Sequence, residues 1–172
     1  MAVSKKTEKF SQIGYLQVVE SAANTLTFAG MSVFSNVLSN QGMIIHSAEY
    51  NLSGATLALP VASGDSVAFG LSGSDSLTSI DLDDPEVYDF NKYIRVDYGT
   101  AATGVPFMQP YKFDFTGLPG GGMLVPADRL FAYVQGASVA AAATVSVRFR
   151  YTLITLGAQD YLELAQTLRV LK

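Results

Sequence analysis

The chain lacks several of the residues on which enzyme and metal chemistry most often depends. It has no cysteine and no tryptophan, and His46 is its single histidine. The absence of cysteine excludes disulfides, thiolate metal sites and thiol nucleophiles together. A metal-dependent enzyme of the cupin kind needs several histidines, so it is disfavoured as well. Catalysis is therefore the class of function that this composition supports least.

Charge is also scarce, and it is unevenly distributed. Charged residues make up 15% of the chain, against roughly 25% in ordinary soluble domains. No lysine or arginine lies between Lys9 and Lys92, although nine acidic residues do. A broad nucleic-acid-binding face needs many cations on one side of the molecule, so the sequence argues against one. It favours instead a neutral surface that other subunits cover.

Long apolar runs are missing too. No stretch approaches the roughly 18 apolar residues that a membrane-spanning helix requires. The lysines near the N-terminus are not followed by an apolar core segment, so we expect no signal peptide. Neither a membrane span nor a secretion signal is therefore predicted.

What the sequence has in abundance is strand-type alternation. The clearest example is 143–155, where apolar and polar residues alternate with a period of two. In 42–52 the same pattern predicts one shared face for Ile44, His46 and Ala48, continued by Tyr50 and Leu52. All six prolines fall between such runs. Eight strands are predicted, at about 12–19, 24–35, 42–52, 65–72, 92–98, 111–116, 128–136 and 143–155.

One helix is predicted after the last strand, at about 158–170, because apolar residues there recur at helical spacing after Gly157. We therefore divide the chain into an N-terminal arm, a β-sandwich and a C-terminal helix or tail, with bounds 1–11, 12–156 and 157–172. Three connections are long for a compact β domain, and long loops of this kind are usually contact surfaces. These are 73–91, 99–110 and 117–127.

His46 is the one side chain suited to general acid–base chemistry near neutral pH. It lies within a predicted strand beside Ile44 and Ile45, which favours a packed or hydrogen-bonded histidine. A Ser–His–Asp arrangement stays open, because such residues meet in space rather than in sequence. No G-x-S-x-G sequence supports it. We therefore predict no catalytic residue.

The densest charge in the chain is a set of five carboxylates within nine residues. Several oxygens in one loop would suit a hard cation such as Ca²⁺, although Pro85 breaks the EF-hand spacing. A solvated acidic loop is the simpler interpretation. Any metal site is predicted here, and no other cofactor is expected. The candidate ligands are Asp81, Asp83, Asp84, Glu86 and Asp89.

Three features are candidate contacts with neighbouring subunits. The basic arm would pair with the acidic loop of a neighbour. The glycine run lets backbones approach closely, and it lacks the Lys-Ser/Thr of a phosphate-binding loop. Tyrosine is favoured at interfaces, with sugar stacking as its competing use. The residues concerned are Lys5, Lys6 and Lys9 in the arm, Gly120, Gly121 and Gly122 in the run, and Tyr161 in the predicted helix.

Four segments carry a resemblance to a known family: 42–50, 129–135, 147–151 and 160–164. Their sequences are GMIIHSAEY, RLFAYVQ, VRFRY and DYLEL. In layout the chain resembles the single jelly-roll capsid proteins of tailless icosahedral viruses of bacteria or archaea. The resemblance implies an all-β fold, an eight-stranded antiparallel β-sandwich (jelly roll) with a short C-terminal helix. It also implies that inter-strand loops and terminal arms contact neighbouring subunits.

The chain departs from many such proteins in having no arginine-rich arm, so direct nucleic-acid binding is expected to be weak or absent. The predicted function is that of a structural capsid subunit, not an enzyme, which assembles with copies of itself in the host cytoplasm and resides in the virion. A second capsid protein is a further candidate partner, and an inner membrane or another protein would lie beneath the shell. The alternative is a jelly-roll binding module for a glycan or a surface, such as a spike or cement protein, with Ca²⁺ in the acidic loop.

Overall fold

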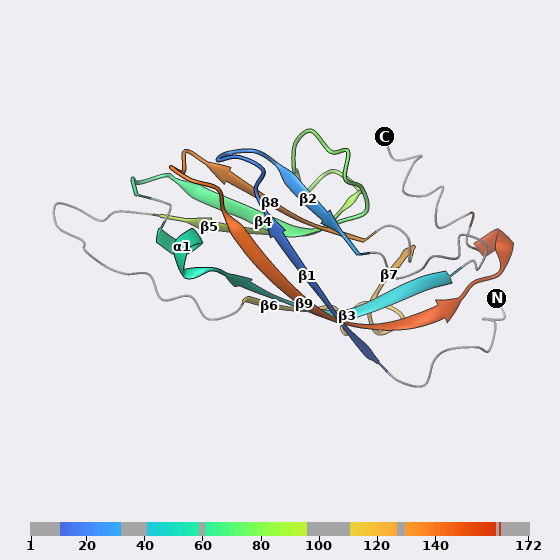
Figure 1. Ribbon diagram of the computed structural model, residues 1–172. Helices are drawn as coiled ribbons and strands as arrows, with labels where there is room; N and C mark the ends of the chain where they lie inside the picture. The colour runs from blue at the N-terminus through green and yellow to red at the C-terminus, as the bar shows by residue number, and fades with distance from the viewer. Residues whose placement is uncertain are drawn as a thin grey trace.

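The computed structural model describes residues 11–31, 41–58, 61–95, 111–126, 130–160 and 162. This part of the chain consists mainly of β-strands, as Figure 1 shows, together with the short helix α1 at Gly54–Ala58. The strands are β1 Gln12–Val19, β2 Thr27–Gly30, β3 Gln41–Leu52, β4 Ser66–Ser72, β5 Val87–Ile94, β6 Tyr111–Asp114, β7 Met123–Pro126, β8 Phe131–Ala137 and β9 Thr144–Thr155.

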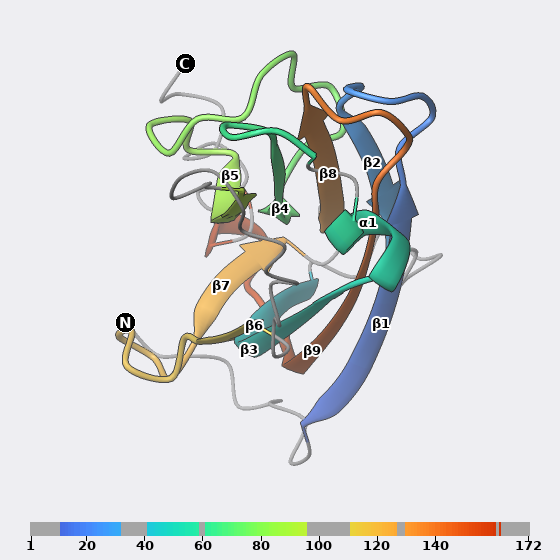
Figure 2. The same cartoon turned by 90° about the vertical axis from the view of Figure 1, so that its left-hand side faces the viewer.

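The strands form two antiparallel sheets that face each other (Figure 2). The first sheet has the order β1-β9-β3-β6, with β7 pairing with β3 as well, and the second has the order β2-β8-β4-β5. If β6 and β7 are counted as two halves of one strand, the strand orders of the two sheets are those of a jelly roll. The predicted all-β sandwich is confirmed.

Nine strands are described where the sequence predicted eight, because the residues before and after one loop both pair with β3. β7 pairs with Gly42–Ile45 and β6 pairs with Ser47–Tyr50. The residues between them, 115–122, leave the sheet as a loop. The sequence did not predict β7, because its few apolar residues lie between a glycine run and Pro126, and such a composition is typical of loops. Proline is tolerated there because β7 lies at the edge of the sheet.

A β-bulge at His46 changes the face that the first half of β3 turns to the core. The pairing with β9 runs regularly to Ile45, skips His46 and resumes at Ser47. One extra residue reverses the alternation. Before the bulge the large side chains that are buried are therefore those of Met43 and Ile45. The predicted shared face of Ile44 and His46 with Ala48, Tyr50 and Leu52 was wrong in its first half, because no sequence periodicity marks the bulge.

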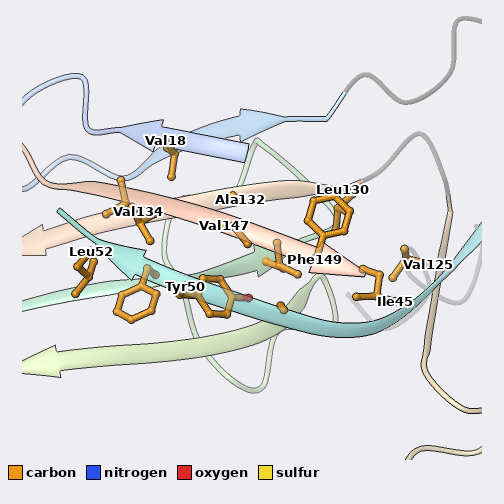
Figure 3. Packing of buried hydrophobic residues seen from close by; sticks show 14 of the residues in the cluster. Val18, Ile45, Tyr50, Leu52, Val125, Leu130, Ala132, Val134, Val147 and Phe149 are labelled. Carbon is orange, nitrogen blue, oxygen red and sulfur yellow. The ribbon is translucent and has the colours of Figure 1, made fainter. Parts of the chain in front are cut away.

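The core lies between the sheets and is built from the inward residues of both. Figure 3 shows side chains of β1, β3, β8 and β9 pointing into this space. Each large apolar side chain that is fully buried contributes about 1.5–3 kcal/mol relative to exposure. The largest fully buried side chains are Tyr50, Tyr133, Phe69, Phe149, Met43, Ile45, Leu71 and Leu130.

A buried carboxylate links two turns of the sandwich through hydrogen bonds. Glu20, directly after β1, is 3% exposed and accepts hydrogen bonds from the backbone N–H groups of Gly136 and Ala143, at 2.5 and 2.6 Å. Nearby, the Asn24 side chain exchanges hydrogen bonds with the backbone of Val139. The turn after β1 and the turn between β8 and β9 are therefore held as one unit.

Residues 158–160 and 162 are helical, as predicted. The other residues of the predicted C-terminal helix lie outside the described residues, as do the arm through residue 10 and the loop 99–110. Among the helices that are described, none has the length and apolar character needed to cross a membrane.

Candidate functional site

A groove of about 540 Å³ lies on the outer face of the first sheet. We call it the outer groove. Its volume falls within the range of roughly 300–1,000 Å³ that is typical of ligand sites. Three neighbouring strands, β1, β9 and β3, supply its walls. It is lined by Tyr15, Leu16, Gln17, Glu49, Tyr50, Asn51, Ser146, Val147 and Arg148.

The strand register arranges the outward side chains of the outer groove in two rows across the three strands. Arg148 on β9 pairs with Tyr15 on β1 and with Glu49 on β3, which forms the first row. Ser146 pairs in the same way with Gln17 and Asn51, which forms the second row. The result is an aromatic ring beside a compact set of hydrogen-bonding groups.

The first row is held by an ion pair. The Arg148 Nε donates a hydrogen bond to Glu49 Oε2 at 2.9 Å, and its Nη2 contacts the same oxygen. The hydrogen bond from Arg148 lowers the pKa of Glu49, so Glu49 is a carboxylate at neutral pH and not a general acid. The Tyr15 side chain is 68% exposed and leaves its ring free to stack on a ligand. The first row therefore presents an exposed ring beside a fixed ion pair.

In the second row, Gln17 Nε2 lies 3.4 Å from Ser146 Oγ. Amide and hydroxyl groups of this kind present both donors and acceptors to a ligand. With the Arg148–Glu49 pair neutral overall, the outer groove suits an uncharged polar molecule.

The structure brings together two features that the sequence treated separately, His46 and the glycine run. His46 Nδ1 lies 2.8 Å from the carbonyl oxygen of Gly121, and Nε2 lies 2.8 Å from the hydroxyl of Thr152. Because a carbonyl oxygen only accepts, Nδ1 carries the hydrogen and Nε2 is left to accept from Thr152 in the neutral ring. His46 thus anchors the loop between β6 and β7.

The backbone conformation and the packing of that loop explain why glycine occupies these positions. Gly120 and Gly121 have φ angles of 91° and 78°, a conformation that other residues rarely adopt. A Cβ on Gly122 would lie 2.6 Å from the carbonyl oxygen of Ile45. The run therefore permits a close approach within one chain, to β3, whereas its predicted role in contacts between subunits stays a prediction.

The five acidic residues do not converge on one point. The carboxylate of Asp81 accepts a hydrogen bond from the backbone of Leu82, and that of Asp84 accepts one from Glu86. Asp89 turns into the core. Within the described ranges, which include the whole acidic loop, no three acidic or histidine side chains are grouped so that they could hold a metal ion. The predicted Ca²⁺ ligands Asp81, Asp83, Asp84, Glu86 and Asp89 are therefore not assembled into a site.

Asp89 instead belongs to a buried polar cluster between the sheets. It is 5% exposed, and its Oδ2 accepts hydrogen bonds from Tyr50 at 2.5 Å and Asn91 at 3.0 Å. The hydroxyl of Tyr133 donates to the Asp89 backbone carbonyl at 2.8 Å. Burial raises the pKa of Asp89 and, together with the nearby carboxylate, raises the pKa values of both tyrosines. The cluster links β5 to β3 across the core.

Several predicted contact residues fall outside the part of the chain that is described, namely Lys5, Lys6, Lys9 and Tyr161. The residues of the outer groove were not predicted as a site. The alternation in 143–155 already placed Ser146 and Arg148 on a polar face, but only the sheet order shows that Tyr15 and Glu49 lie beside them.

No protein-family model matches the chain, and no curated protein is significantly similar to it.

Proposed function

We propose that this protein is a structural subunit of a viral capsid, which assembles into an icosahedral shell through its loops and N-terminal arm. The observation that carries the proposal is a jelly-roll sandwich that leaves large apolar side chains exposed. Covering such a side chain in a contact gains about 1.5–3 kcal/mol at most. The exposed ones are Ile13, Tyr15, Val19, Val61, Leu82, Ile94, Tyr111, Phe113, Leu118, Leu124 and Leu162.

In this proposal the mechanism is association rather than catalysis. Apolar burial drives contacts between copies of the chain, and the few charges set their register. The partners are other copies, with a second capsid protein as a further candidate, and the location is the virion after assembly in the host cytoplasm. The low number of cations supports little direct contact with nucleic acid.

Light scattering followed by negative-stain imaging of the purified protein tests the shell directly. Closed particles of uniform size are expected. Removal of residues 1–9 should impair particle formation while the thermal unfolding transition stays in place, since the arm precedes β1. A protein that stays monomeric at high concentration in every buffer would contradict the proposal.

A second candidate function, binding of a neutral saccharide, is favoured by the outer groove. Sugars are recognised by an aromatic ring that stacks on their apolar face and by planar polar groups that bond neighbouring hydroxyls. Tyr15 offers the ring, and Arg148, Glu49, Gln17 and Asn51 offer the polar groups.

Titration with the methyl glycosides of galactose, mannose and N-acetylglucosamine, followed by NMR, tests this second function. Tyr15→Ala should weaken any binding roughly tenfold, in line with the contribution of an aromatic stacking contact. Tyr111→Ala is the matched control, because Tyr111 is 46% exposed and does not line the outer groove. Absence of saturable shifts with all three glycosides would rule these saccharides out as ligands of the outer groove.

A further inference from the structure

In the part of the chain that the structure describes, the two sheets have four edges, and three of these are protected against pairing with another strand. β2 has only four residues. The edge formed by β6 and β7 is interrupted by a loop and carries Lys112, Asp114 and Pro126. β5 pairs irregularly with β4 and carries the exposed Lys92. Short length, charge, proline and irregular pairing are the usual means by which edges avoid pairing.

The fourth edge, β1, has none of these protections. It is eight residues long, contains no charge and no proline, and pairs with β9 without a bulge. Among the described residues no strand pairs with its other side. Its outward side chains include Ile13, Tyr15 and Val19, which are 50%, 68% and 51% exposed. Figure 2 shows β1 at the margin of the first sheet.

We propose that β1 pairs antiparallel with β1 of a second copy of the chain, about a two-fold axis at Leu16. This inference rests on the proposed shell and names one of its contacts. An isologous contact must be self-complementary, and this register satisfies that condition on the outward face. Ile13 faces Val19 of the second copy, so apolar side chains meet, and Tyr15 faces Gln17. A register centred on Tyr15 would instead place Ile13 opposite Gln17 and Val19 opposite Ser11.

Charge agrees with a second copy as the occupant, and the buried area shows that this contact cannot stand alone. β1 is uncharged, so pairing it with itself buries no unpaired ion. A stable interface buries about 800 Å² per partner through 20–30 residues, so an eight-residue edge supplies roughly 300 Å² per partner. This is less than half of what a stable dimer needs. The contact therefore belongs to an assembly in which other surfaces are buried as well.

A charge exchange at the two facing positions tests both the contact and its register. Ile13→Lys with Val19→Lys sets like charges opposite each other twice, and the protein concentration needed for association should rise roughly tenfold or more. Ile13→Lys with Val19→Glu sets opposite charges there and should restore most of the association. Ala141→Lys with Ala142→Lys adds the same two charges at exposed positions between β8 and β9, and this matched control should leave the association unchanged. Sedimentation over a range of concentrations measures the association, and circular dichroism checks the fold.

Association of the double-lysine variant at the same protein concentration as the wild type overturns the inference, and if particles still form in that variant the shell proposal stands alone. Association that responds to the charge exchange without any particle supports the β1 contact and removes the shell. If the double-lysine protein does not fold, Ile13→Cys with Val19→Cys replaces it, since the chain has no other cysteine. Facing residues of antiparallel strands lie within disulfide reach. A disulfide-linked dimer supports the register, and its absence under oxidation overturns it.

Discussion

Replacing Tyr50 by Phe removes one hydroxyl from the buried polar cluster and leaves the ring in place. That hydroxyl donates to the Asp89 carboxylate at 2.5 Å, and Tyr50 is 2% exposed. Because the ring still fills its space, no cavity forms. The change therefore isolates a single hydrogen bond to a buried acidic group.

The expected cost follows from the charge of the acceptor. A hydrogen bond to a charged group contributes about 1.5–3 kcal/mol and one between neutral groups about 0.5–1.5 kcal/mol. When Asp89 is ionised, Tyr50→Phe should therefore lower the free energy of unfolding by about 2 kcal/mol, or about 4–8 °C in Tm for a chain of this size. When Asp89 is protonated, the cost should fall to about 1 kcal/mol. The penalty must grow as pH rises.

Tyr133→Phe is the matched control. Tyr133 is as deeply buried and donates to the same residue, but its acceptor is the neutral backbone carbonyl of Asp89, at 2.8 Å. Its removal should cost about 1 kcal/mol at every pH. Burial raises the pKa of both tyrosines, so neither hydroxyl ionises in the range tested.

Urea denaturation of the wild type and both variants at several pH values between 4 and 8 gives the three sets of unfolding free energies. The two variants should differ little near pH 4 and by about 1 kcal/mol near pH 8. Equal penalties for Tyr50→Phe and Tyr133→Phe at all pH values would refute the reasoning, since Asp89 would then be uncharged or unbonded to Tyr50.

Three further predictions concern stability. Asp89→Asn should remove a pH dependence of the free energy of unfolding, because burial raises the pKa of Asp89 above its ordinary value of 3.8. The contribution of Asp89 to stability is therefore full below pH 3.8 and falls as pH rises through the folded pKa. An unchanged pH profile of stability in the variant would contradict this. Glu20→Gln should cost about 2 kcal/mol in urea denaturation, because one of two buried backbone N–H groups loses its acceptor. Gly122→Ala should cost about 1–3 kcal/mol through its clash with Ile45, whereas Gly117→Ala, with open space around it, should cost almost nothing; equal effects in thermal unfolding would contradict the packing argument.

Strand positions could be predicted where the alternation of side chains is a local property. The prediction of 12–19 matches β1, and 143–155 matches β9 within one residue. The residues concerned face the core and the solvent in turn, so the alternation of apolar and polar residues in the sequence is enough to predict the strand. The absence of cysteine and the low charge were equally local facts.

β5 shows where local reasoning failed. It begins at Val87, five residues before the predicted start, because Asp89 was read as part of a solvated loop. A carboxylate is buried in a strand only when partners satisfy it, and these come from Tyr50 on another sheet and from Asn91. The same reasoning explains the predicted metal site that the structure does not assemble.

The sequence by itself determined the class of fold, most of the strands and the scarcity of catalytic groups, since each of these depends on residue type and spacing. The tertiary structure alone decided which strands became neighbours. The order and register of the strands account for the bulge at His46, the two rows of the outer groove and the unprotected edge of β1. Residues such as Tyr15 and Glu49 acquire a shared surface only through β9 between them, because sheet order is set by packing of the whole core rather than by any single segment.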